Sequence, residues 1–221
     1  MTPALYPIPA VVVLVFVLIR AEILGKRQQV YVVKPAATLL VIGVAALSLL
    51  VPTRNMTYTV GILIGLLFSL GGDVALMFHE DRTAFAVGLG LFLLAHVAYA
   101  VVFTLLGRLS GLDGVSILAL LAVGIGFYAL VQSNLGTLRI PVIAYMVVIS
   151  VMVSRAVSTS ASPVFGSEQA ILVASGAVLF YVSDVILAAN RFWKPMKYDR
   201  ISLAFYYGGQ LLIALAASYF P

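Results

Sequence analysis

The chain has 221 residues, of which 63% are apolar and only 10% are charged. Soluble domains are typically 45–50% apolar and about 25% charged, so this composition, with its mean hydropathy of +1.14, excludes a water-soluble domain. Eight spans of about 20 residues would use most of the length and leave no room for a folded domain outside the membrane. We therefore expect an all-α, polytopic bundle of about eight transmembrane helices, forming one domain over residues 1–221. The absence of cysteine excludes disulfides, thiolate metal sites and cysteine nucleophiles.

Apolar runs that are broken by charged and turn-forming residues predict the spans in chain order. They cover residues 4–21, 33–51, 57–78, 84–106, 115–131, 140–158, 168–189 and 201–219. The first run has no basic residue before it and no convincing cleavage site after it. We therefore interpret it as a retained first helix rather than as a signal peptide.

Lysine and arginine are distributed unevenly between the two sides of this bundle. The side that follows the first, third, fifth and seventh spans carries ten of the 13, namely Arg20, Lys26, Arg27, Lys34, Arg82, Arg139, Arg191, Lys194, Lys197 and Arg200. The opposite side carries the other three, Arg54, Arg108 and Arg155. Because cytoplasmic loops are enriched in Lys and Arg, we expect a multi-pass protein of the cell membrane, the inner membrane in a bacterium, with both termini on the non-cytoplasmic side. The same bias accounts for the net charge of +5 without a nucleic-acid partner.

Two acidic residues, Asp73 and Asp184, fall inside predicted spans. A charged side chain at the centre of a span costs on the order of 2.5–3.5 kcal/mol, so such residues usually face the bundle interior and mark a site. Each acid lies five or six residues before the expected cytoplasmic end of its helix, roughly 8–9 Å inside that boundary at 1.5 Å per residue. Each also follows a glycine, Gly65 or Gly176, by eight residues, an internal echo that chance also explains. The alternative to a functional pair is a structural ion pair or cap.

Further polar side chains are expected to enter the membrane from the same side: Lys34, Tyr145, Tyr206, Tyr207 and Gln210. A snorkelling lysine and an aromatic belt at the interface are the alternatives for the lysine and the tyrosines. His96 and Tyr99, one turn apart, are expected at mid-membrane, so that no histidine lies at the depth of the two acids. A histidine there often serves only as a hydrogen bond between helices.

Several of these residues stand in segments that resemble the signatures of the YhhN family, the lysoplasmalogenases. The stretch from Phe68 to Met77, which contains Gly71-Gly72-Asp73, resembles one signature, and the stretch from Gly176 to Phe192, which contains Ser183-Asp184 and Asn190-Arg191, resembles the second. Also similar are Lys34-Pro35, the His96 and Tyr99 pair, Ile140-Pro141-Val142 before Tyr145, and the group from Tyr206 to Gln210. The likeness spans the chain and keeps the order of these segments.

The resemblance implies a YhhN-like domain that hydrolyses the vinyl ether bond of a lysoplasmalogen, releasing a fatty aldehyde and a glycerophospho-alcohol. It implies a lysophospholipid-type substrate within membrane lipid. We expect no cofactor and no metal. Asp73 and Asp184 are then the catalytic candidates. The candidates for substrate binding are Lys34, His96, Tyr99, Tyr145, Ser183, Arg191, Tyr206, Tyr207 and Gln210. Family resemblance leaves the substrate of an individual member open.

Two carboxyl groups suit this chemistry. A vinyl ether hydrolyses by protonation at carbon, which gives an oxocarbenium-like cation that water then attacks. The reaction needs a general acid that keeps its proton near neutral pH and a carboxylate that stabilises the cation and activates water. Glycosidases meet a related demand with two carboxylates. The sequence does not say which aspartate is the acid, and either Lys34 or an arginine of the basic loop is a candidate for binding the phosphate.

Other classes of protein are weighed against this interpretation. A small-solute or proton-coupled transporter would also hold two intramembrane acids at one depth, and hydrolysis by purified protein in detergent separates the two hypotheses. A retinal receptor is disfavoured because residues 168–189 and 201–219 contain no lysine in mid-span. A zinc hydrolase with three histidine ligands is excluded because His79 and His96 are the only histidines.

Overall fold

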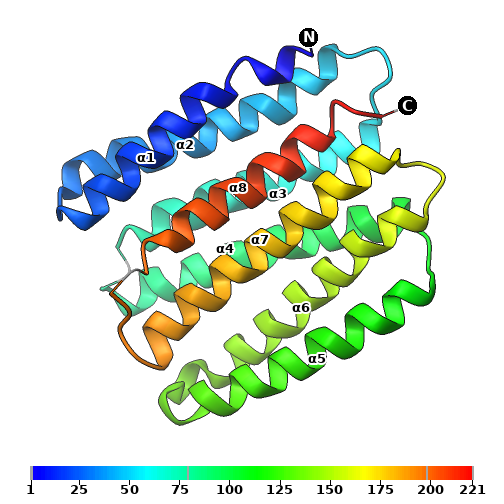
Figure 1. Cartoon of the computed structure of the whole chain (residues 1–221). Helices are drawn as coiled ribbons and strands as arrows, with labels where there is room; N and C mark the ends of the chain where they lie inside the picture. The colour runs from blue at the N-terminus through cyan, green and yellow to red at the C-terminus, as the bar shows by residue number, and fades with distance from the viewer. Residues whose placement is uncertain (1, 79, 198, 221) are drawn as a thin grey trace.

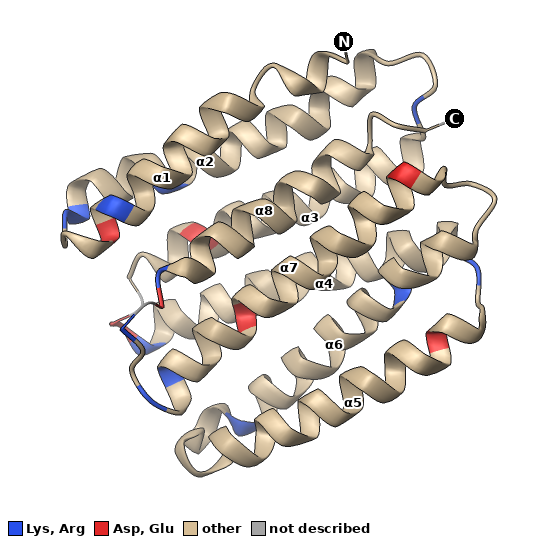
Figure 2. Cartoon of the chain, viewed as in Figure 1, with Lys and Arg blue, Asp and Glu red and all other residues tan. Residues whose placement is uncertain are grey.

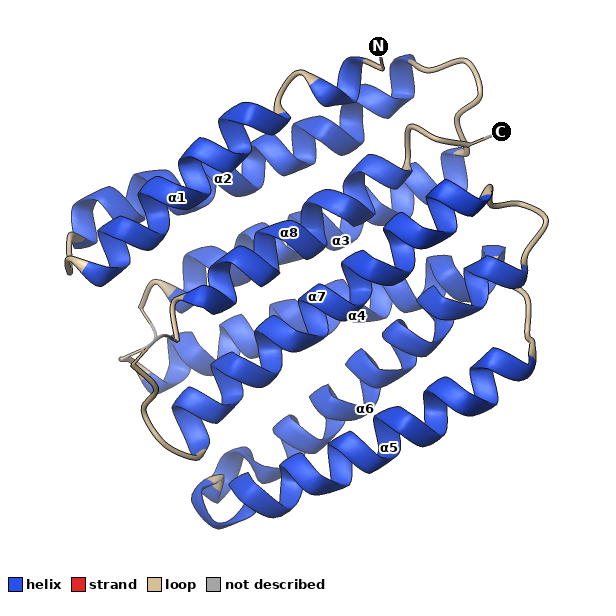
Figure 3. Cartoon of the chain, in the orientation of Figure 1, coloured by secondary structure: helices blue, strands red, loops and turns tan. Residues whose placement is uncertain are grey.

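The computed structural model describes residues 2–78, 80–197 and 199–220, and the expected loop residue His79 therefore lies outside the described residues. Within these ranges the chain forms eight α-helices, with bounds α1 Ile8–Ile23, α2 Arg27–Leu47, α3 Met56–Leu76, α4 Arg82–Leu106, α5 Gly111–Val131, α6 Arg139–Val157, α7 Ser167–Phe192 and α8 Ile201–Ala216. Short 3₁₀ turns are η1 Pro3–Leu5, η2 Ser48–Leu50, η3 Gln132–Asn134, η4 Gly136–Leu138 and η5 Ser158–Ala161. The described ranges contain no strand (Figure 3). The expected all-α fold is thereby confirmed.

Seven of these described helices, counted together with the short 3₁₀ turns that adjoin some of them, are long and apolar enough to cross a membrane, and α1 with η1 covers Pro3–Ile23. The chain is therefore a multi-pass membrane protein. The eighth, α8, is apolar but has only 16 residues, about 24 Å at 1.5 Å per residue, which is less than the ~30 Å of a hydrocarbon core. This helix lies in the middle of the bundle, where it packs on α7 and also contacts α1, α2 and α3 (Figure 1). Its neighbours shield it from lipid, so it need not span the full thickness by itself.

The helices run side by side, and both ends of the chain lie at the same end of the bundle (Figure 1). The closest helix pairs are α3 with α4 and α7 with α8. At the second contact the two backbones meet, because a Cβ on Gly176 would lie 2.8 Å from the carbonyl oxygen of Gly209, and one on Gly209 would lie 2.6 Å from that of Gly176. On α3, Gly65 and Gly72 make room for the rings of Tyr99 and Phe92 of α4. Small residues of this kind let membrane helices approach closely.

Helix α5 is the least embedded of the eight. Among the described residues, α6 is the only α-helix that it packs against extensively, and most of its side chains face outward. A buried ion pair helps to fix it, in which Arg155 of α6 contacts Asp113 of α5 at 2.9 Å. Ser116 and Ser154 form a hydrogen bond of 2.9 Å between the same two helices. Helix α5 is therefore an outer wall rather than part of the core.

Several helix boundaries differ from the expected ones; for example, α1 begins at Ile8 instead of at residue 4, and α5 begins at Gly111 instead of at residue 115. Two of the differences lengthen a helix beyond its apolar run. Helix α2 begins at Arg27 instead of at residue 33 and contains Pro35, and α7 continues to Phe192 instead of ending at residue 189. The added turns carry exposed polar residues, among them Arg27 and Arg191. A helix that projects beyond the apolar layer keeps its hydrogen bonds in water, so hydropathy alone underestimates its length. Figure 2 shows lysine and arginine gathered at the end of the bundle where α1, α3, α5 and α7 finish.

Candidate active site

A polar cavity of about 280 Å³ opens among the helix ends on this basic side of the bundle. Its polar lining comes from helices α1, α2, α3, α7 and α8 and from the connection between α7 and α8. These side chains are Glu22, Lys34, Asp73, Ser183, Asp184, Asn190, Arg191, Asp199, Arg200, Ser202 and Tyr206. Both intramembrane acids thus line one cavity together with Lys34 and Tyr206.

Asp73 sits in a dense set of donors. Its side chain is 2% exposed, and its Oδ1 lies 3.5 Å from the Nζ of Lys34. Its Oδ2 accepts hydrogen bonds from the hydroxyls of Thr38, at 2.6 Å, and Tyr206, at 2.7 Å. Tyr207 braces this group by donating to the backbone carbonyl of Lys34 at 3.0 Å. A cation and two hydroxyl donors all favour the ionised carboxylate.

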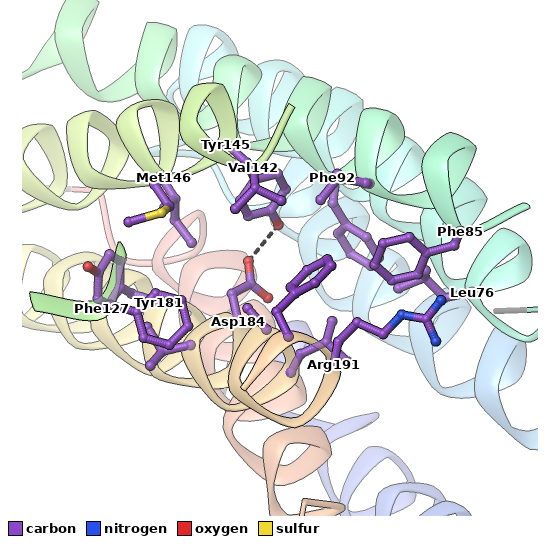
Figure 4. Close-up of a pocket in the computed structure, with 16 residues that line it drawn as sticks. Leu76, Phe85, Phe92, Phe127, Val142, Tyr145, Met146, Tyr181, Asp184 and Arg191 are labelled. Carbon is purple, nitrogen blue, oxygen red and sulfur yellow. Dashed lines mark hydrogen bonds between the residues drawn. The ribbon is translucent and has the colours of Figure 1, made fainter. Parts of the chain in front are cut away.

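Asp184 has different partners. Its Oδ2 accepts a hydrogen bond of 2.5 Å from the hydroxyl of Tyr145 (Figure 4), and the same oxygen lies 3.6 Å from Nε2 of His96. The other ring nitrogen of His96, Nδ1, is 2.6 Å from the carbonyl oxygen of Phe92. Because a carbonyl oxygen only accepts hydrogen bonds, Nδ1 must carry the hydrogen. In the neutral ring, Nε2 then has a lone pair, and this lone pair faces Asp184. Among the described residues, no lysine or arginine lies within ion-pair distance of Asp184.

An apolar slot of about 70 Å³ adjoins the polar cavity. Figure 4 shows its wall, in which Phe127, Val142 and Met146 lie on the side of α5 and α6, and Asp184 and Arg191 project from α7. The slot and the polar cavity share the side chains of Leu76, Phe85, Phe92, Asp184, Leu187 and Arg191. Asp184 therefore stands at the junction of a polar space and an apolar one.

An aromatic cluster lies beside the two acids and joins their surroundings. The ring of Phe180 is 4.6 Å from that of His96 and 5.2 Å from that of Tyr206. Phe92 contacts Tyr206 and Phe180 edge-on, at 5.7 and 6.2 Å. This packing holds the partners of Asp73 and Asp184 in one unit.

The expected binding residues divide into two groups. Lys34, Ser183, Arg191 and Tyr206 line the polar cavity, and Tyr145 lines the apolar slot. The other four line neither space, so the geometry does not support direct contact with a substrate for His96, Tyr99, Tyr207 and Gln210. All four are fully buried against neighbouring helices. They act instead on other side chains; Tyr99, for example, donates to Gln210 at 2.7 Å, and Gln210 donates to Tyr206 at 3.4 Å.

One expectation about the surroundings of the acids was wrong. Asp73 lies three residues before the end of α3 at Leu76 and Asp184 lies eight residues before the end of α7 at Phe192, and both line one cavity. The expectation that no histidine accompanies the acids fails, because His96 faces Asp184.

Some residues of the site were not anticipated. Thr38 was missed, although its place one turn after Lys34 on the same face of α2 is a usable signal. Glu22, at the end of α1, and Asp199, in the connection between α7 and α8, were also missed, because charged residues at the ends of spans are expected at any membrane surface. Within the parts of the chain that the structure describes, no three His, Cys, Asp or Glu side chains are grouped as a metal site would require.

Comparisons with known proteins agree with these features. The lysoplasmalogenase TMEM86A of Bos taurus is 33% identical over 163 residues, covering 71% of this chain and 64% of the relative. TMEM86A of Homo sapiens is 32% identical with the same coverage, and lysoplasmalogenase TMEM86B of Sus scrofa is 32% identical, covering 71% of this chain and 62% of the relative. The chain thus spans less than two thirds of the length of these relatives. No solved structure matches it significantly. The model of the YhhN family matches residues 29–217, and the chain belongs to the YhhN family.

Proposed function

We propose that the protein is a membrane hydrolase that cleaves the vinyl ether bond of a lysoplasmalogen into a fatty aldehyde and a glycerophospho-alcohol. The observation that carries this proposal is the position of Asp184 at the junction of the polar cavity and the apolar slot, with Asp73 on the same cavity. A single-chain ether lipid likewise has a polar and an apolar part, because its ether bond joins a polar head to a hydrocarbon tail. The head would lie in the polar cavity and the tail would enter the slot. The names of the lysoplasmalogenase relatives support the reaction class.

The surroundings of the two acids support different roles. Asp73, beside Lys34 and two hydroxyl donors, is suited to remain a carboxylate that stabilises a cation and activates water. Asp184 has no cation partner among the described residues and borders the apolar slot, which suits a general acid that enters the reaction protonated. His96, with Nε2 turned to Asp184, would hold that proton in place.

The steps balance with water as the only co-reactant. Asp184 gives its proton to the second carbon of the alkenyl chain, and the ether oxygen shares the positive charge left on the first carbon. Water attacks that carbon and gives a proton to Asp73, which forms a hemiacetal. The bond from that carbon to the glycerol oxygen then breaks. The glycerol oxygen takes the proton from Asp73, and the hemiacetal hydroxyl returns one to Asp184, so that both acids regain their starting states.

The test uses purified protein in detergent and two lipids that differ in one double bond. With 1-alkenyl-glycerophosphoethanolamine, we expect release of fatty aldehyde and glycerophosphoethanolamine in equal amounts. With the saturated 1-alkyl analogue we expect neither product, because an alkyl ether offers no carbon to protonate. Hydrolysis needs no ion gradient, whereas transport does.

Two results would contradict the proposal. Release of a product from the alkyl ether would show that carbon protonation is not the mechanism. Failure to release aldehyde from any alkenyl lysolipid would remove the hydrolase function and leave the small-solute or proton-coupled transporter as the hypothesis to test in vesicles.

A further inference from the structure

Three cationic side chains line the polar cavity, and two of them are held by acids. Lys34 lies 3.5 Å from Asp73, and Arg200 lies 3.6 Å from both Glu22 and Asp199. Arg191 differs, since its guanidinium lies 4.8 Å above the ring of Phe85 and no acid among the described residues pairs with it. An external anion can therefore bind Arg191 without breaking an internal ion pair.

Arg191 also has a defined position relative to the reacting group. It follows Asp184 by seven residues on α7, which is two helical turns and about 10.5 Å along the axis. The two residues therefore share one face of the helix, and both line the polar cavity and the slot. The guanidinium of Arg191 extends toward Phe85 rather than toward Asp184 (Figure 4), so a ligand that reaches both groups must bridge the space between them.

We propose that Arg191 is the anchor for a phosphate ester and that its two-turn spacing from Asp184 selects the lipid. This proposal rests on the hydrolase function above and names its specificity. In a glycerol lysolipid, six bonds separate the vinyl ether carbon from phosphorus, roughly 7–8 Å when extended with bonds of about 1.5 Å. A phosphate held at Arg191 thus puts the ether bond at Asp184 and the first few carbons of the hydrocarbon tail in the slot. Arginine suits this task because its fork of N–H groups binds phosphate oxygens in pairs.

The kinetic test compares 1-alkenyl-glycerophosphoethanolamine with 1-alkenylglycerol, which lacks the phosphate. For Arg191→Gln we expect KM for the phosphate-bearing lipid to rise by about 10- to 100-fold, the range for hydrogen bonds to charged groups, with kcat changed by less than about twofold. KM for 1-alkenylglycerol should stay as in the wild type. Arg191→Lys should restore part of the loss.

The matched control is Lys194→Gln. Lys194 is an exposed cation two residues after the end of α7, lies 4.4 Å above the ring of Trp193, and lines neither cavity. This variant should behave as the wild type with both lipids. An equal loss in Arg191→Gln and Lys194→Gln, or a loss of kcat without a change of KM in Arg191→Gln, would overturn the anchor.

A binding measurement separates the anchor from the chemistry. The melting temperature of the protein in detergent is compared with an uncleavable 1-alkyl-glycerophosphoethanolamine, with 1-alkylglycerol and with inorganic phosphate. We expect only the first to stabilise the wild type and Lys194→Gln, and we expect Arg191→Gln not to respond. That pattern supports phosphate binding by Arg191 even if no aldehyde is ever released. In that case the hydrolase proposal is wrong and the binding proposal is not. An equal response of Arg191→Gln, or stabilisation by inorganic phosphate alone, contradicts the lipid anchor.

Discussion

The two acids of the cavity have contrasting surroundings. Asp73 is enclosed and directly bound by Lys34, Thr38 and Tyr206, whereas Asp184 is 15% exposed and has Tyr145 as its hydrogen-bond donor, with His96 facing it. In the proposed mechanism, the first arrangement keeps a carboxylate and the second keeps a protonated carboxyl group at the edge of an apolar space. The neighbours would thus prepare two identical side chains on one cavity for opposite roles.

The largest effect is expected from replacing Asp184. Asp184→Asn removes the proposed proton donor and keeps the size of the side chain, so aldehyde release should fall by about 100-fold or more. Its melting temperature should stay near that of the wild type, because no cation is left unpaired. Glu168→Gln is the control, an acid-to-amide change at an exposed position in the first turn of the same helix. Near-normal turnover in Asp184→Asn would show that this acid is structural.

Asp73→Asn should reduce turnover by a similar factor and should also destabilise the protein. Removing one partner of a buried ion pair typically costs about 3–5 kcal/mol, and here Lys34 would be left buried without its acid. The double variant Lys34→Met with Asp73→Asn should recover the melting temperature but not the aldehyde release. If the double variant regained activity, Asp73 would serve only to neutralise Lys34.

A smaller effect, about tenfold at neutral pH, is expected from His96→Asn, which removes the nitrogen that faces Asp184. In the wild type, aldehyde release should fall as pH rises, by up to about tenfold per pH unit, because only a protonated acid donates. In His96→Asn this fall should begin at a lower pH, since the neutral carboxyl group loses its acceptor. An unchanged pH profile with lower activity would assign His96 to packing alone.

The smallest effects should come from the tyrosine hydroxyls. Tyr145→Phe and Tyr206→Phe each remove one hydrogen bond to an acid, and a net contribution of about 0.5–1.5 kcal/mol per bond corresponds to a change of roughly 2- to 13-fold. The melting temperature should fall more for Tyr206→Phe, because its ring belongs to the fully buried network around Asp73. If the melting temperature fell more for Tyr145→Phe, the surroundings of Asp184 would be the more rigid of the two, contrary to the comparison above.

Much of the fold could be predicted from the sequence, because apolar runs and their charged breaks locate the helices directly. The shared cavity of Asp73, Asp184, Lys34 and Tyr206 was also predictable, since polar groups inside a membrane must turn toward the bundle interior. The approach of His96 to Asp184 was not, because it depends on the relative height and rotation of α4 and α7. Those quantities are set by packing between helices and leave no periodic trace in either segment.

The contact between Gly176 and Gly209 holds α7 and α8 in a fixed register, whereas the described helices on the other side of the slot are not held in this way. Asp184 lies two turns beyond Gly176 on α7, and Tyr206 lies one turn before Gly209 on α8. Because the two backbones touch, neither helix can slide without carrying the other, so the polar partners on α7 and α8 keep their register. The rest of the slot is lined largely by α4, by α6 and by α5, which packs mainly on α6. Substitutions that change the accepted tail length or branching are therefore expected in α5 and α6, where they alter the slot without moving the acids.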